Sequence, residues 1–344
     1  MKNLIYTLLV CSLFTINIAA QDVHFSQNHA SHLSINPANT GLLHDLNATV
    51  MYRNQYSSVA TPFKTSMVSF DMVTASSKSN NATLGVGAQF LYDDSGDSQL
   101  KTTAANLNVS GILKLDANSK LSLGLMGGYG QRSTDLSNLR WDSQYQNGVY
   151  NSQLSSNENF NDMGFNYFDA GAGLAFSFGK DQTYITANDD VKGSFGVSAF
   201  HFGLPTHTFY GSGETLKTKY VAHGRVEFGK QNTNLTFIPS AYFMLQGKQK
   251  EILVGNTFRY LLQEGSRYTG FKKSSSIGMG VHYRWMDAVV ANVQIDYANY
   301  SVGFAYDFNV STLSPVSQGR GGFELFLRFV TPNPFSRSSV ARIN

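Results

Sequence analysis

The residues best suited to chemistry lie close to the start of the chain. Residues 21–41 contain three histidines, three serines and three asparagines. His24, His29 and His32 are spaced i, i+5, i+8, a pattern that does not align them on a strand face and aligns them only loosely on a helix face. A zinc site needs three or four organised ligands with supporting hydrogen bonds, and Asp22 is the one carboxylate close by. The pattern therefore favours hydrogen-bonded packing over a metal site.

The first 20 residues are typical of a secretory signal peptide. They carry one positive charge at Lys2, an apolar run from Leu4 to about Ile18, and two alanines at the end. A membrane anchor is the weaker interpretation, because the apolar run is shorter than the roughly 20 residues that a spanning helix needs. Cleavage after residue 20 would remove Cys11, the only cysteine, and with it any disulfide or thiol chemistry.

The remaining composition is unusual for a soluble domain. Charged residues make up 14% of the chain and aromatic residues 13%, against about 25% charged residues in typical domains. The formal net charge of +3 gives no basis for nucleic-acid binding, and no later apolar segment is long enough to span a membrane as a helix. This combination favours an outer-membrane barrel, with a large secreted β-sandwich as the alternative.

Strict alternation in the sequence decides between these two folds. In residues 300–310, "YSVGFAYDFNV", every even position is apolar or aromatic and every odd position is small or polar, as in a strand whose faces meet two different solvents. The less apolar face carries mostly glycine, serine and asparagine, which suits a barrel lumen better than a sandwich exterior. Comparable segments lie near residues 46–56, 64–74, 82–93, 100–115, 119–132, 166–179, 193–204, 216–229, 234–247, 250–263, 274–286, 287–297, 299–310 and 321–330.

The sequence thus predicts an all-β fold, a transmembrane antiparallel β-barrel of about 14 strands, within a range of roughly 12 to 16. The predicted layout is a signal peptide (1–20), a polar periplasmic or lumenal lead-in (21–45) that gates or plugs the barrel, the barrel (46–330) and a C-terminal tail (331–344). The long polar segment 133–166 is expected to be extracellular, with a shorter outer loop near 204–215. Pro239 predicts a bulge or bend in its strand.

Ten charged residues lie at the alternate strand positions whose side chains are predicted to face the lumen. Buried charges need partners, and because the signs are mixed, a structural network is favoured over the selectivity filter of a channel. The predicted lumen network is Arg53, Asp71, Arg225, Glu227, Arg259, Arg284, Asp296, Asp307, Glu324 and Arg328.

Several motifs in order along the chain resemble the PorP/SprF family of Bacteroidetes outer-membrane proteins. They are "HFSQ", "NPANTG", "YRNQY" at residues 52–56, "WDSQYQNGVYN", "NYFDAGAGLAFSF", "KYVAHGRVEF", "YSVGFAYDFNVS" and "GGFELFLRF". The resemblance implies a non-enzymatic barrel of the type IX secretion and gliding-motility apparatus, which anchors or helps secrete a surface protein. The chain departs from the family pattern at two places. Tyr56 replaces a tryptophan-like residue by another aromatic one, and a tail follows the last strand.

We therefore expect an outer-membrane protein without catalytic residues, metal or cofactor, and with no nucleic-acid partner. Its expected partners are an adhesin-like secreted protein with a C-terminal sorting domain, other type IX secretion components and outer-membrane lipid. Aromatic residues are common interface anchors, and those of the long loop are the candidate contacts: Trp141, Tyr145, Tyr150, Phe160 and Phe165. Alternatively, the terminal segment of the partner enters the barrel mouth. A porin-like channel and a surface lipase with a paired serine and histidine are the competing functions.

Overall fold

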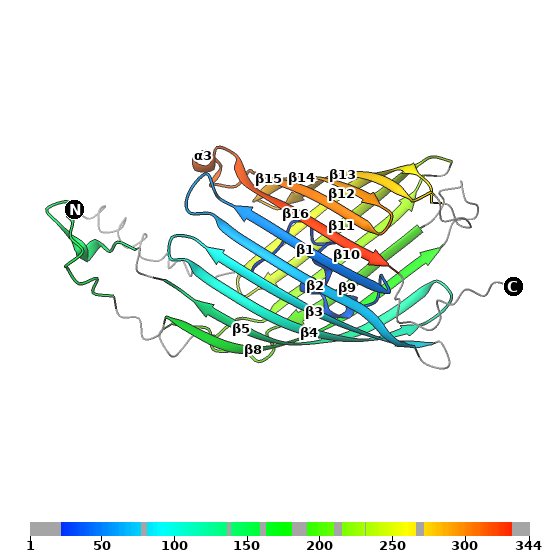
Figure 1. Ribbon diagram of the computed structural model, residues 1–344, viewed down its shortest axis with the longest axis horizontal. Helices are drawn as coiled ribbons and strands as arrows, with labels where there is room; N and C mark the ends of the chain where they lie inside the picture. The colour runs from blue at the N-terminus through cyan, green and yellow to red at the C-terminus, as the bar shows by residue number, and fades with distance from the viewer. Residues whose placement is uncertain are drawn as a thin grey trace, which may run out of the picture.

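The alternating segments form strands that close into one antiparallel barrel (Figure 1). The computed structural model describes residues 22–76, 81–135, 139–158, 163–180, 191–209, 215–230, 232–265 and 272–331. The fourteen barrel strands are β1 (Leu46–Gln55), β2 (Phe63–Ser76), β3 (Ala82–Ser95), β4 (Leu100–Lys114), β5 (Ser119–Ser133), β8 (Gly164–Lys180), β9 (Val191–Phe200), β10 (Lys219–Gly229), β11 (Leu235–Gln246), β12 (Gln249–Gln263), β13 (Ser275–Arg284), β14 (Ala288–Tyr297), β15 (Tyr300–Asn309) and β16 (Arg320–Thr331).

Closure joins the first strand to the last. β1 pairs with β2 on one side and with β16 on the other, in a register that places Leu46 opposite Thr331. Every strand therefore has two neighbours, so no sheet edge is left with unpaired backbone groups that lipid could not satisfy. No helix within the described ranges is long and apolar enough to cross a membrane. The predicted closed antiparallel barrel of about 14 strands is confirmed.

The two faces of the wall differ as the alternation predicted. Outward-facing Leu107, Leu125 and Val281 are more than half exposed, whereas inward-facing Asn108 and Ser122 are almost fully buried. Apolar side chains thus cover the outside, where lipid would contact them, and polar side chains face the lumen.

The two ends of the barrel carry connections of different length. One end holds the start of β1 and the finish of β16, and we call it the terminal end. The opposite end, here called the loop end, carries segments 134–163 and 201–218. Segment 134–163 includes a small hairpin of β6 (Tyr145–Gln146) and β7 (Val149–Tyr150), preceded by η2 (Asp142–Gln144), which projects beyond the wall (Figure 1). A short helix, α3 (Ser314–Ser317), also lies at the loop end. Long loops are typical of the extracellular side.

Pro239 was predicted to cause a bulge or a bend, and no bulge is present. It keeps its place in the ladder of β11 with β12, opposite Asn256, without a register shift. Instead, the pairing of β10 with β11 is interrupted between Arg225 and Phe228, because proline has no N–H to give to that ladder. Register shifts among the described strand pairs fall elsewhere, in β2, β12 and at the end of β15.

An arginine placed on the outside of the wall should reveal the lipid-facing surface. Leu125 lies outward near the middle of β5, and Gln131 lies outward near the end of the same strand. We expect Leu125→Arg to reduce the free energy of unfolding by about 2–4 kcal/mol and Gln131→Arg by about 0–1 kcal/mol, because the cost of a cation falls with distance from the bilayer midplane. Denaturant unfolding in lipid vesicles measures the free energy of unfolding of both variants. An equal loss in the two would contradict this placement of the membrane.

Candidate functional site

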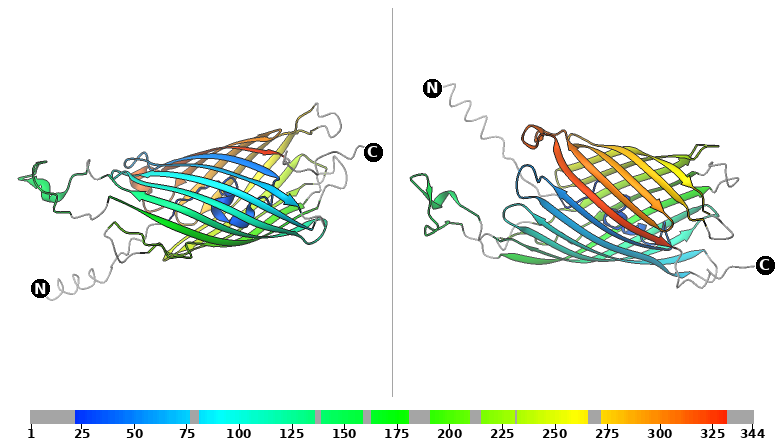
Figure 2. Two further views of the ribbon diagram at one scale, coloured as in Figure 1. Left: turned by 60° about the horizontal axis from the view of Figure 1, so that its bottom comes forward. Right: turned by 45° about the horizontal axis from the view of Figure 1, so that its top comes forward.

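The polar lead-in lies inside the barrel. Residues 22–45, which we call the plug, contain two short helices, α2 (His32–Ile35) and η1 (Pro37–Asn39), and the ribbon drawn in dark blue is enclosed by the strands (Figure 2). Asp22 contacts Lys219 and Gln246 at the loop end, and the plug runs from there to the start of β1 at the terminal end. The plug therefore passes along the lumen, and most of its side chains from Phe25 to Leu42 are buried.

Asn36 organises the middle of the plug. Its side-chain oxygen accepts a hydrogen bond from the Ala38 backbone N–H at 2.9 Å, which caps η1. Its side-chain nitrogen donates to the carbonyl oxygens of Leu174 at 2.9 Å and Val197 at 3.3 Å. One fully buried amide thus joins the plug to the neighbouring strands β8 and β9.

Glycines on the inward face of the wall make room for this part of the plug. A Cβ atom at Gly124 of β5 would overlap the backbone of Pro37 and Ala38, and one at Gly173 of β8 would overlap the Asn36 side chain. A close approach of two backbones is a recurrent reason for glycine in a strand. The inward glycines, visible in the sequence as small residues on the polar face, thus form a seat for residues 36–41.

Filling this seat should displace the plug without disturbing the wall. Gly124→Val places two methyl groups where the Pro37 backbone lies, whereas Gly127→Val on the outward face of the same strand meets open space. We expect Gly124→Val to destabilise the fold by about 1–3 kcal/mol and to expose the plug to limited proteolysis. Thermal unfolding and protease digestion of the two variants measure this, and equal digestion would show that the glycine seat does not hold the plug.

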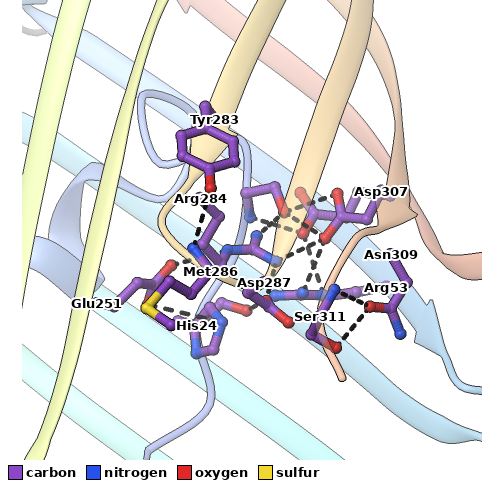
Figure 3. Close-up of polar contacts among 12 residues, drawn as sticks. His24, Arg53, Glu251, Tyr283, Arg284, Met286, Asp287, Asp307, Asn309 and Ser311 are labelled. Carbon is purple, nitrogen blue, oxygen red and sulfur yellow. Dashed lines mark hydrogen bonds and ion pairs between the residues drawn. The ribbon is translucent and has the colours of Figure 1, made fainter. Parts of the chain in front are cut away.

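A second set of contacts joins the plug to the wall near the loop end (Figure 3). The Glu324 carboxylate accepts hydrogen bonds from the backbone N–H groups of Ser26 at 2.6 Å and Gln27 at 2.9 Å. The Ser26 hydroxyl donates to Asp307 at 2.9 Å, and Arg53 donates to the carbonyl oxygen of His24. Because charge-assisted hydrogen bonds are among the stronger ones, this cluster fixes the start of the plug in place.

The charges of this cluster are paired with one another. Arg53 lies 3.2 Å from both Asp307 and Glu324, and Arg284 lies 2.9 Å from Asp307 and 3.0 Å from Glu251. The side chains of all five residues are at most 5% exposed. Desolvation of a buried charge is tolerated only when partners surround it, so each ion depends on the others.

Replacing Arg53 alone should lower the free energy of unfolding more than replacing Arg53 together with Glu324. We expect Arg53→Met to destabilise the protein by about 3–5 kcal/mol, because it leaves Asp307 and Glu324 buried with less compensating charge. The double variant Arg53→Met/Glu324→Gln should recover part of that loss. Denaturant unfolding of the single and double variants measures the coupling, and strictly additive costs would show that the two side chains do not act as a pair.

The remaining predicted lumen residues form separate groups. Asp71 accepts hydrogen bonds from the Gly41 backbone N–H and the Asn47 side chain, and lies 2.9 Å from the His32 ring. Glu227 pairs with Arg225 and Arg259 at 3.0 and 2.9 Å. Other inward contacts join Asp296 to Ser276 and Gln294, and Arg328 to Ser301. The ten predicted residues therefore face the lumen but do not converge on one centre.

The three histidines of the plug have three different environments. His29 lies 3.1 Å from the Gln294 side chain, His32 contacts Asp71, and His24 lies 3.6 Å from Glu251. Among the described residues, no three histidine, cysteine or acidic side chains are grouped to hold a metal ion.

Sequence reasoning missed the polar contacts at the loop end of the plug. Asp22 lies 2.7 Å from His201 and 2.8 Å from Lys219, and the other ring nitrogen of His201 lies 2.9 Å from Asp169. Burial alone would raise the pKa of Asp22, but Lys219 and His201 hold it well below its usual value. Glu251 was also missed, although it lies on the same inward face of β12 as Arg259.

The candidate contact residues of segment 133–166 do not form one surface. Trp141 precedes η2, and the rings of Tyr145 and Tyr150 lie 5.7 Å apart in the projecting hairpin. Phe165 belongs to β8 and packs against His207 and Phe209 at the mouth of the barrel. Phe160 lies outside the described residues.

A closed barrel with an apolar exterior and a lumen occupied by its own polar segment defines an outer-membrane barrel protein. The model of one family, described as type IX secretion system membrane protein PorP/SprF, matches residues 17–329. The chain therefore belongs to the PorP/SprF family, as its motifs indicated. Fold and family together point to the outer membrane and to a role alongside other type IX secretion components. A search of curated proteins finds no match.

Solved structures resemble the chain only distantly. A Pseudomonas aeruginosa FadL homologue has 11% identity and a TM-score of 0.45, with 88% of this chain and 93% of that one covered. CdiB from Acinetobacter baumannii has 8% identity and a TM-score of 0.42, with 84% and 60% covered, so the chain spans 60% of CdiB. BamA from Haemophilus ducreyi has 9% identity and a TM-score of 0.42, with 83% and 70% covered. These similarities add no functional information.

Proposed function

We propose that this protein is a non-enzymatic barrel that anchors, or helps to secrete, an adhesin-like surface protein with a C-terminal sorting domain. In this proposal a cleaved signal peptide sends the chain to the periplasm, from where it enters the outer membrane. The family supports a role in secretion. The observation that carries the proposal is the plug, whose hydrogen bonds and ion pairs with the wall occupy the lumen with the chain's own residues.

The projecting hairpin is the proposed contact surface for the partner. Tyr145 and Val149 are 45% and 68% exposed, and the Arg140 guanidinium lies 4.8 Å from the centre of the Tyr150 ring. A small aromatic and cationic surface of this kind matches the residue types enriched at interface centres. Because the hairpin stands apart from the barrel, a partner can contact it without rearranging the wall (Figure 1).

Purification from native outer membranes tests the proposal. A tagged copy is extracted in mild detergent, and mass spectrometry identifies what accompanies it. We expect a large secreted protein in near-equal amount, and we expect the triple variant Tyr145→Ser/Val149→Ser/Tyr150→Ser to recover less than about a tenth of it, since interface anchors commonly contribute more than 1 kcal/mol each.

The matched control changes exposed apolar residues in other loops at the same end, Met286→Ser and Val316→Ser. This control should keep the partner. Equal recovery from both variants would place the contact elsewhere. A barrel that is recovered alone and conducts ions in a planar bilayer would contradict the anchor and favour a channel.

A further inference from the structure

A small pocket opens between the plug and the wall at the loop end of the lumen. It has a volume of about 100 Å³ and is bordered by the polar side chains of Arg132, Tyr167 and His207. Its apolar border includes Leu91, Met126 and Phe200. Ligand pockets for whole small molecules are roughly 300–1,000 Å³, so this pocket fits only the end of a larger ligand.

Arg132 is the distinctive residue of the pocket. No carboxylate of the described residues lies within ion-pair distance of its guanidinium, and its Nε is buried without a hydrogen-bond partner. Its contact within those residues is His207, whose Nε2 lies 2.6 Å from Nη1. Burial, followed by the Arg132 charge, lowers the pKa of His207 to about 4, so the ring is neutral at pH 7 and accepts this bond. A guanidinium has five N–H donors, and within the described residues only those of Nη1 have a hydrogen-bond partner.

The neighbouring acids already have other partners. Asp93 accepts hydrogen bonds from the hydroxyls of Thr65 and Ser95, both at 2.6 Å. Asp22 and Asp169 line the pocket themselves, but both lie within ion-pair distance of His201, and Asp22 also pairs with Lys219. Arg132 is half-buried and has no carboxylate of the described residues within ion-pair distance, and a planar guanidinium matches a carboxylate in two parallel hydrogen bonds. The chemistry that completes this pocket is therefore an added carboxylate.

We propose that the pocket receives the terminal carboxylate of a partner polypeptide, held by Arg132 with the last apolar side chain against Leu91, Met126 and Phe200. This proposal rests on the proposed function, because it assumes a protein partner at the loop end. A lipid headgroup is the poorer match, since Arg132 faces the lumen behind a closed wall. A terminal segment entering the mouth would contact both the plug and β5.

Calorimetric titration of the full-length protein in detergent tests the pocket directly. The probe is the peptide Gly-Ser-Gly-Ser-Val-Leu with a free terminal carboxylate, compared with the same peptide ending in an amide. We expect the free acid to bind at least tenfold more tightly than the amide, and Arg132→Gln to remove this difference. Arg328→Gln should preserve it, since Arg328 is inward-facing but lies outside the pocket. Equal binding of acid and amide by the unsubstituted protein overturns the proposal, whether or not the variants fold.

Sodium acetate and sodium phosphate distinguish a peptide site from a site for small anions. Binding of either salt as tightly as the peptide would overturn the assignment to a polypeptide end. Co-purification then separates the two proposals. A partner retained by Arg132→Gln leaves the anchoring function intact but overturns the pocket. Selective peptide binding by a barrel that is recovered without any partner supports the pocket and overturns the anchor.

Discussion

The hydrogen bonds between the plug and the inward face of the barrel are the interactions on which the rest of the structure depends. A wall that turns apolar side chains toward lipid must turn polar ones inward, and buried polar groups are costly unless they are paired. The plug supplies many of those partners from its own backbone and side chains, as the contacts of Ser26, Asn36 and Gly41 show. The polar stretch that suggested chemistry in the sequence therefore completes the barrel.

The strongest of these contacts lie where the barrel closes. Arg53 on β1 is directly opposite Glu324 on β16 in the strand register, and Asp307 comes from the adjacent β15. The same carboxylate of Glu324 receives the plug backbone. Strand closure and plug placement are thus coupled through one buried cluster, so disturbance of the seam should also loosen the plug. The glycine seat on the opposite side, in β5 and β8, adds shape complementarity to this charge pairing.

The sequence predicted the wall well because alternation is a local property. Each strand shows its two faces in its own residues, as residues 300–310 do, and the strand count follows. The position of the plug could not be read in this way, because its partners are remote in sequence: Asn36 binds carbonyl groups of residues 174 and 197. Alternation along the strands predicted that the charged residues face the lumen, but it could not predict which of them form ion pairs. Asp22 precedes the first strand, and His201 lies in the predicted segment 193–204 but beyond the end of β9, so alternation could not predict that the two side chains meet.

The proposed function depends on different roles for the plug and for the loop end of the barrel. An open solute channel needs a water-filled lumen, whereas here the chain's own segment runs along the lumen and is fixed at both ends, by Lys219 near its start and by Asp71 near its finish. The groups that we propose for recognition lie at the loop end: the exposed hairpin and the guanidinium of Arg132. A partner that used both would be held by aromatic contacts outside the barrel and by one charge-assisted contact inside it. Such a two-point contact fixes orientation as well as affinity, and both properties suit a surface protein that must be retained at the membrane.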